Sequence, residues 1–218
     1  MVSEGGFKIK IEIWSDYVCP FCYIGKRRLE SALEQFAHQN EVVIEYRSFE
    51  LNPQGSMYSG KNMHQILSEK HGMSIEQAKE ANAKLGQQAA MMGLVYNFDQ
   101  MKPTNTFDAH RLTQYAKSVG KDKELSEKLF YSYYTEAKLI SDHDTLADIA
   151  ESIGMNRDES MAVLQDPSKY ANEVRSDEAT AKQLGITGAP FFVIDRKYAI
   201  SGAQPIEIFL SALNQAAQ

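Results

Sequence analysis

The stretch Ile9-Lys-Ile-Glu-Ile-Trp14, followed after four residues by Cys19-Pro20-Phe21-Cys22, decides the fold of this chain. The apolar run predicts a β-strand, and a helix is expected to begin at the cysteines. Pro20 fits the first helical turn, where its missing N–H would have no intrahelical partner. The only two cysteines among the 218 residues are therefore expected at a strand-to-helix turn.

The pattern around this turn predicts a βαβ unit. The helix is expected to run from about Cys19 to His38, and Val42–Phe49 alternates as a second strand. A strand, a crossover helix and a strand imply a parallel pair. Helical periodicity then continues from about Asn62 to Leu164, including a capping box at Ser74-Ile-Glu-Gln77.

The last fifth of the chain returns to β-structure. A helix over Tyr170–Leu184 precedes two short strands, Pro190–Ile194 and Tyr198–Ser201, and a final helix over Pro205–Gln215. So short a connection between strands predicts an antiparallel hairpin. The expected fold class is therefore α/β, with a mixed four-stranded sheet, flanking helices and a large all-helical insertion.

Composition argues against several classes of function. The net charge is −6, and only Lys26-Arg27-Arg28 places basic residues together, which argues against a nucleic-acid partner. No run is long enough to span a bilayer. The segment Met1–Lys10 lacks the apolar core of a secretory signal, so we expect a cytoplasmic protein without a membrane partner.

The two cysteines predict thiol–disulfide exchange. The thiolate is the nucleophile of that reaction, and a helix N-terminus stabilises it through unpaired N–H groups and the helix dipole. We expect the Cys19 sulfur to be exposed and to attack, while Cys22 lies behind it and resolves the mixed disulfide. The alternatives are a zinc site and an inert buried pair. Zinc would need two further ligands, and no His-x3–5-His pair exists, so no metal is expected.

A second signal lies far along the chain, where Gly188-Ala189-Pro190 precedes the strand Phe191–Ile194. A proline at the head of a strand is either a harmless edge residue or the site of a cis peptide bond.

These motifs together resemble those of a known family. Trp14-x-Asp-Tyr-x-Cys-Pro-Phe-Cys22, Gly185-Ile-Thr-Gly-Ala-Pro-Phe-Phe-Val-Ile194 and Ser201-Gly-Ala-Gln204 look like the DsbA-like thioredoxin-fold proteins, and within them the FrnE-like cytosolic branch. The resemblance implies a thioredoxin fold in two parts, residues 1–61 and 166–218, with residues 62–165 as a helical insertion domain. It also implies that Pro190 is a cis-proline packed against the redox-active disulfide and that the Ala189 backbone pairs with substrate.

The chain departs from the family pattern at two positions. Ile13 stands where thioredoxin and DsbA have a buried acid, and Phe21 stands where DsbA has histidine. Loss of that donor and charge should make the pair less strongly oxidising, and Phe21 offers an apolar surface to clients. Asp16 is either a proton-transfer group or a turn and cap residue.

Other polar and aromatic residues allow two interpretations each. His110 lies in a segment that, in the family and in the related kappa-class glutathione transferases and chromene-carboxylate isomerases, borders the cleft, so it is a candidate substrate contact. Its chemistry alone favours a structural hydrogen bond. For Lys26-Arg27-Arg28 a solvated helix face is favoured, and for the tyrosines at 131, 133 and 134 packing is favoured.

We therefore expect a thiol–disulfide oxidoreductase or isomerase acting through a mixed disulfide at Cys19. Its partners would be protein or small-molecule disulfides and thiols, and it would need no cofactor beyond the cysteine pair, with glutathione as a candidate co-substrate. The alternative is a glutathione-dependent transferase or isomerase, and a third possibility is a binding module in which the pair senses redox state. Transferase chemistry has little need of a resolving cysteine, so the retained Cys22 weighs against that alternative.

Overall fold

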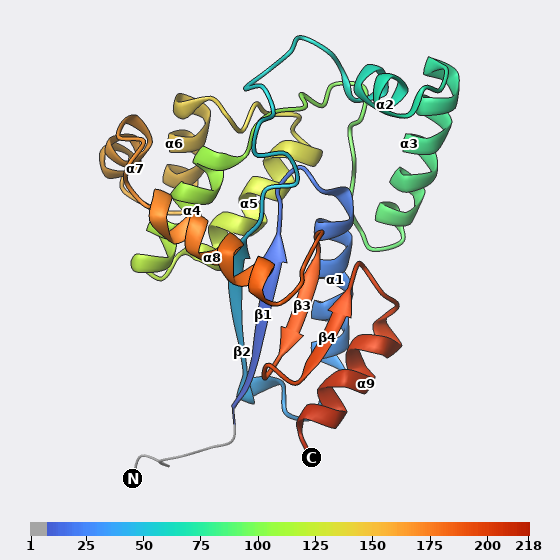
Figure 1. Cartoon of the computed structure of the whole chain (residues 1–218), viewed down its shortest axis with the longest axis vertical. Helices are drawn as coiled ribbons and strands as arrows, with labels where there is room; N and C mark the ends of the chain where they lie inside the picture. The colour runs from blue at the N-terminus through green and yellow to red at the C-terminus, as the bar shows by residue number, and fades with distance from the viewer. Residues whose placement is uncertain (1–7) are drawn as a thin grey trace.

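A four-stranded mixed sheet forms the lower half of the molecule in Figure 1. The computed structural model describes residues 8–218, and the first seven residues, expected to open the fold, lie outside the described residues. The strand order is β2-β1-β3-β4, with β1 parallel to β2 and antiparallel to β3. The parallel β1–β2 pair, the antiparallel β3–β4 hairpin and the mixed sheet are those that the sequence predicts. The strands are β1 (Ile9–Ser15), β2 (Val42–Ser48), β3 (Phe191–Ile194) and β4 (Tyr198–Ser201).

Helices cover both faces of this sheet. On one face, α1 (Pro20–Glu34) and α9 (Ile206–Ala216) pack against the isoleucines of β1, which are fully or almost fully buried. On the opposite face Trp14 packs near α8 (Ala171–Gln183), where its indole N–H donates to the Asp177 carbonyl at 2.9 Å. Burying such side chains contributes about 1.5–3 kcal/mol each.

Six helices lie between β2 and α8 in the chain and form the upper half of Figure 1. The predicted capping box is confirmed, because Ser74 Oγ accepts from the Gln77 N–H at 3.1 Å and Gln77 Oε1 accepts from the Ser74 N–H at 2.8 Å. The helices are α2 (Met63–His71), α3 (Ile75–Ala90), α4 (Phe107–Ser118), α5 (Asp122–Tyr134), α6 (His143–Ser152) and α7 (Arg157–Gln165).

One helix boundary differs clearly from the sequence prediction. Helix α1 ends at Glu34 rather than near His38, because the following residues form tighter turns that bury Phe36 in the core beside α9. Helix α6 is capped by Asp142, whose carboxylate accepts a hydrogen bond from the Thr145 N–H at 2.9 Å.

The helical block shares its core with the active-site turn. Cys19 and Cys22 pack in the same hydrophobic cluster as Leu112 of α4 and Phe130 of α5. The division of the chain at residues 61/62 and 165/166 stays a prediction.

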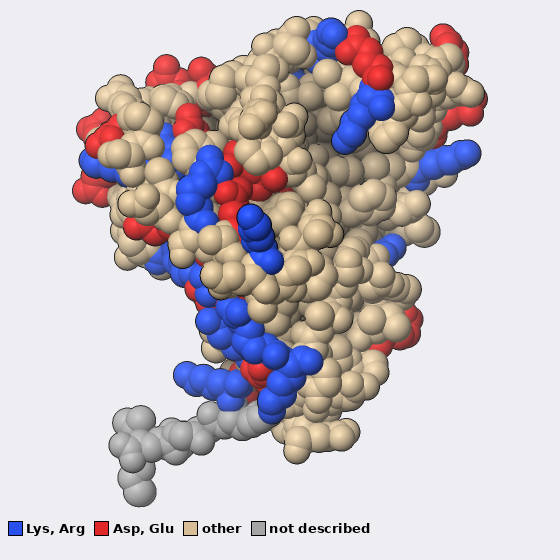
Figure 2. All heavy atoms as spheres, viewed as in Figure 1, with Lys and Arg blue, Asp and Glu red and all other residues tan. Residues whose placement is uncertain are grey.

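In Figure 2, Lys and Arg side chains gather over the lower part of the molecule, where the sheet lies, and charges of both signs occur on the helical part above it. Around the sheet they pair: Lys10 lies 2.6 Å from Glu45, and Arg47 lies 2.8 Å from the buried Glu12. Within residues 8–218, the helices are all too short or too polar to cross a bilayer.

Candidate active site

The cysteine turn has the geometry that the sequence predicts. Cys19 is the N-cap of α1, in extended conformation, and Pro20 is its first helical residue. The Cys19 N–H donates to the Asp16 carbonyl at 3.1 Å, and the Cys22 N–H donates to the Cys19 carbonyl at 3.0 Å. Both cysteines are free thiols at the N-terminus of the helix. The unpaired N–H groups at this end can stabilise a thiolate.

Cys19 lies against the segment that begins β3. Its thiol donates to the Ala189 carbonyl oxygen at 3.4 Å, and the Ala189–Pro190 peptide bond is cis. The expectation of an exposed Cys19 sulfur is wrong for this structure, because the residue is only 3% exposed. Tyr96, from the loop after α3, covers this turn and donates its hydroxyl to the Pro20 carbonyl at 2.7 Å.

Phe21 is the residue of the motif that faces solvent, with 44% of its surface exposed. Such an apolar side chain beside the thiols suits contact with a client, but the substrate-binding roles of Phe21 and Ala189 stay predictions.

Cys22 lies deeper than Cys19 and makes different contacts. It is 2% exposed, and the Asp16 N–H donates to its sulfur at 3.4 Å. Burial raises the pKa of Cys22 well above its usual value, and the interaction with Cys19 raises it further. A thiol that stays protonated at neutral pH is a poor first nucleophile, which suits a resolving role.

Asp16 and His110 form a buried pair behind the cysteines. His110 Nε2 lies 3.3 Å from Asp16 Oδ1, and the two side chains are 3% and 1% exposed. The other oxygen of Asp16 accepts from the Leu51 N–H at 2.7 Å, so the carboxylate does not cap α1. His110 has its ring 4.9 Å from that of Tyr17, and its predicted contact with substrate stays a prediction.

Gly25 belongs to the site, although the sequence analysis did not identify it. A Cβ at this position would lie 3.1 Å from the Phe192 ring and 3.2 Å from Pro190 Cγ. The missing side chain therefore lets Pro190 and β3 approach α1 one turn after Cys22. A glycine inside an otherwise good helix, three residues after the second cysteine, was the available signal.

The basic run after the cysteines is not a solvated face, which corrects the sequence prediction. Lys26 is 7% exposed and lies 2.5 Å from both Glu30 and Glu127. Arg27 bonds the same two carboxylates, and Arg28 donates to the Ala203 carbonyl. The two carboxylates balance the charges of Lys26 and Arg27, and Glu127 links α5 to α1.

The tyrosines of α5 agree with the packing interpretation, two of them in the core and one at the surface. Tyr133 and Tyr134 are fully buried, while Tyr131 is 41% exposed. Tyr96, which the sequence reading did not single out, stacks on Tyr134 with ring centroids 4.3 Å apart. An aromatic cluster thus connects the covering loop to the helical core beside the cysteines.

A dithiol at a helix N-terminus, facing a cis-proline on a four-stranded mixed sheet, defines a thiol oxidoreductase or isomerase of the thioredoxin fold. The chain belongs to the family described as the DSBA-like thioredoxin domain, whose family model matches residues 10–214.

Individual proteins agree with this assignment. The chain is 43% identical to a probable DsbA oxidoreductase from Streptomyces coelicolor, with a TM-score of 0.92 over 96% of this chain and 90% of that one. It is 26% identical to the uncharacterized protein YwbO of Bacillus subtilis (strain 168), covering 94% of this chain and 96% of the relative. Its fold is also similar to that of the cytosolic disulfide reductase DsbM from Pseudomonas aeruginosa, solved with GSH, at 14% identity and a TM-score of 0.65, covering 95% and 98% of the two chains.

Proposed function

We propose that this protein is a DsbA-like thiol–disulfide oxidoreductase whose Cys19–Cys22 pair reacts through a mixed disulfide at Cys19. The observation that carries the proposal is the placement of the two sulfurs. Cys19 lies at the helix N-terminus beside the Ala189 carbonyl and the cis-proline, whereas Cys22 is buried behind it with a raised pKa. This asymmetry suits one attacking and one resolving thiol.

The exchange proceeds in two displacements. In the reducing direction the Cys19 thiolate attacks a client disulfide, forms a bond to one client sulfur and releases the other as a thiolate. Cys22 then attacks the Cys19 sulfur, and the second client sulfur leaves as the Cys19–Cys22 disulfide forms. The pair loses two electrons and the client disulfide gains them, and the reverse sequence oxidises a client dithiol.

The proposed substrates are disulfides and thiols of proteins or small molecules. Phe21 supplies an exposed apolar surface, and the Ala189 backbone lies beside the attacking sulfur, where an extended chain can pair with it. We propose a cytoplasmic protein of the FrnE-like branch, with glutathione as co-substrate, and the cytosolic DsbM solved with GSH supports this choice. Pro190 would pack against the disulfide and shape the site.

The test is trapping with a Cys22→Ser variant. In this variant the mixed disulfide cannot be resolved, so incubation with a disulfide-bonded client should leave a covalent adduct that mass spectrometry assigns to Cys19. The control is Cys19→Ser, which should trap nothing. Absence of an adduct, together with conjugating activity toward glutathione in the Cys22→Ser protein, would instead assign the chain to the glutathione-dependent transferases or isomerases.

A further inference from the structure

A set of buried polar groups behind Cys22 is not used by the two displacements. Asp16 contacts the Cys22 sulfur through its N–H at 3.4 Å, and its carboxylate lies 3.3 Å from His110 Nε2. With Nε2 turned toward the carboxylate, Nδ1 is the ring nitrogen that remains for a second partner. A buried carboxylate–imidazole pair thus stands next to a thiol that must lose its proton before it can attack.

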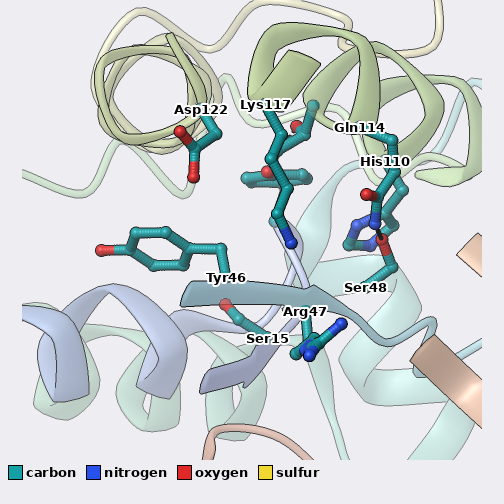
Figure 3. Close-up of a pocket in the computed structure, with 10 residues that line it drawn as sticks. Ser15, Tyr46, Arg47, Ser48, His110, Gln114, Lys117 and Asp122 are labelled. Carbon is teal, nitrogen blue, oxygen red and sulfur yellow. Dashed lines mark hydrogen bonds between the residues drawn. The ribbon is translucent and has the colours of Figure 1, made fainter. Parts of the chain in front are cut away.

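A small pocket lies beside His110. It lies between β1, β2, α4 and the start of α5, and its walls include Ser15, Ser48, His110 and Gln114 (Figure 3). Its volume of about 10 Å³ has room for about one water molecule. Gln114 donates to Ser48 Oγ at 3.0 Å, the contact drawn as a dashed line in Figure 3.

Ser15 of β1 and His110 of α4 both line this pocket. Asp16, the residue after Ser15, contacts both the Cys22 sulfur through its N–H and the His110 ring through its carboxylate. The carboxylate–imidazole pair is therefore linked to Cys22 through Asp16.

We propose that His110, oriented by Asp16, accepts the proton of Cys22 when the mixed disulfide is resolved, because Asp16 contacts both the Cys22 sulfur and the His110 ring. His110 and Asp16 act in this step as positioning and proton-transfer residues. The proposal rests on the proposed function, since it concerns the second displacement only. It also gives the chain a proton acceptor although Ile13 replaces the buried acid of related proteins.

The step balances as follows. The Cys22 S–H bond breaks and its proton passes to His110, while the sulfur electron pair forms the bond to Cys19. The Cys19–client bond breaks, and its electron pair leaves on the client sulfur. The client thiolate takes a proton from solvent and His110 returns one to solvent; in the oxidising direction each transfer is reversed.

Burial makes such an acceptor necessary. Because the pKa of Cys22 is raised, few molecules hold its thiolate at neutral pH without a base. Tyr17 is not the proton acceptor for Cys22. Burial raises the pKa of its phenol to about 12, and its hydroxyl lies 2.6 Å from Thr113 Oγ1. The titratable and charged groups that surround His110, Asp16 and the pocket are Tyr17, Cys22, Tyr46, Arg47, Glu50, Lys117, Asp122 and Tyr133.

Ellman's reagent separates the two displacements in a stopped-flow experiment. The reduced protein should release one thionitrobenzoate as Cys19 attacks and a second as Cys22 resolves the mixed disulfide. His110→Gln and Asp16→Asn should leave the first release unchanged and slow the second by about 100-fold or more at neutral pH. In both variants the second rate should rise about tenfold per pH unit, because it then follows direct ionisation of Cys22.

The matched control is His64→Gln. His64 is also a buried histidine, 2.9 Å from Asp99 and 2.9 Å from Asn82 on the other side of the helical block, and its variant should behave as wild type. Should either Asp16 or His110 variant unfold, the wild-type protein gives an independent result: only its second release should be slower in deuterated water.

Three outcomes are distinguishable. A second release with the rate and pH profile of His64→Gln, or one that deuterated water does not slow, overturns the proton-transfer role. A Cys19→Ser protein that releases thionitrobenzoate as fast as wild type, or a wild-type protein that releases none, overturns the proposed function instead. One release from Cys22→Ser, two from wild type and a selectively slowed second release in the variants support both.

Discussion

The Cys19 thiol and the Ala189 carbonyl oxygen lie 3.4 Å apart although 170 residues separate them in the chain. The antiparallel register of β1 and β3, which places Trp14 opposite Phe191, brings the end of one strand beside the start of the other. Because side chains alternate across a strand, a slip of one residue would exchange the two faces of the slipped strand and move its side chains into the wrong core. The hydrophobic core thus fixes the redox site.

We expect Phe21→His to make the disulfide more oxidising. A donor and a partial positive charge at this exposed position favour the thiolate of the reduced form, and a charge interaction of about 1 kcal/mol shifts the equilibrium constant by about fivefold. The equilibrium of the Cys19–Cys22 pair against a glutathione buffer measures the shift. Phe21→Leu, which changes size without adding charge, is the control; an equal shift in both variants would contradict the electrostatic reason.

We expect Tyr96→Phe to loosen the cover over Cys19. The variant loses the 2.7 Å hydrogen bond to the Pro20 carbonyl, which should lower the free energy of unfolding by about 1 kcal/mol. The rate of Cys19 alkylation by iodoacetamide should rise, because the buried residue becomes more accessible. Tyr131→Phe, at an exposed position of α5, serves as the control. Unchanged alkylation in Tyr96→Phe would show that Tyr96 does not restrict access.

We expect two glycine substitutions to change stability in opposite directions. Gly86→Ala should raise the free energy of unfolding by about 0.5–1 kcal/mol, because its Cβ would meet only the Phe98 ring at 3.7 Å and alanine favours the helix. Gly25→Ala gains the same propensity but crowds Pro190 and Phe192, and overpacking of this kind costs about 1–3 kcal/mol. Urea unfolding measures both. A Gly25→Ala protein as stable as Gly86→Ala would mean that β3 can move aside freely.

We expect Glu127 to contribute to stability at neutral pH and to lose that contribution in acid. Burial alone would raise its pKa, but hydrogen bonds from Arg27 and the charge of Lys26 outweigh burial and lower the pKa to about 2. Since the pKa is lower in the folded state than the usual 4.5, the stabilisation is present above about pH 4.5 and disappears as pH falls toward 2.

The Glu127→Gln variant tests this dependence. It should be less stable than wild type by about 1–2 kcal/mol at neutral pH, between the values for exposed and buried ion pairs, and should lose less stability in acid. The urea midpoint, followed from neutral pH to about pH 2, gives both quantities. Glu124→Gln, on the exposed side of α5, is the control. Parallel curves for wild type and Glu127→Gln would refute the linkage.

Local sequence predicted much of the fold because its signals act over a few residues. The period-two run of β1, the proline after Cys19 and the Ser74 capping box each specify their own element, and each is found where expected. The sequence predicted helix ends without a capping residue less accurately. Helix α1, for example, ends at Glu34, earlier than predicted. The burial of Lys26 in an ion pair could not be predicted locally, because its partner Glu127 lies 101 residues away in the chain.

The sequence by itself determined the strand-to-helix placement of Cys19 and Cys22, the mixed sheet and the family, since these depend on periodicity, proline geometry and contiguous motifs. Only the tertiary structure decided that Cys19 is covered by Tyr96, that Gly25 admits Pro190, and that Asp16 binds His110 behind Cys22. The physical reason is that burial and hydrogen bonding depend on which distant segments pack together, and no local pattern encodes the partner of a buried polar group.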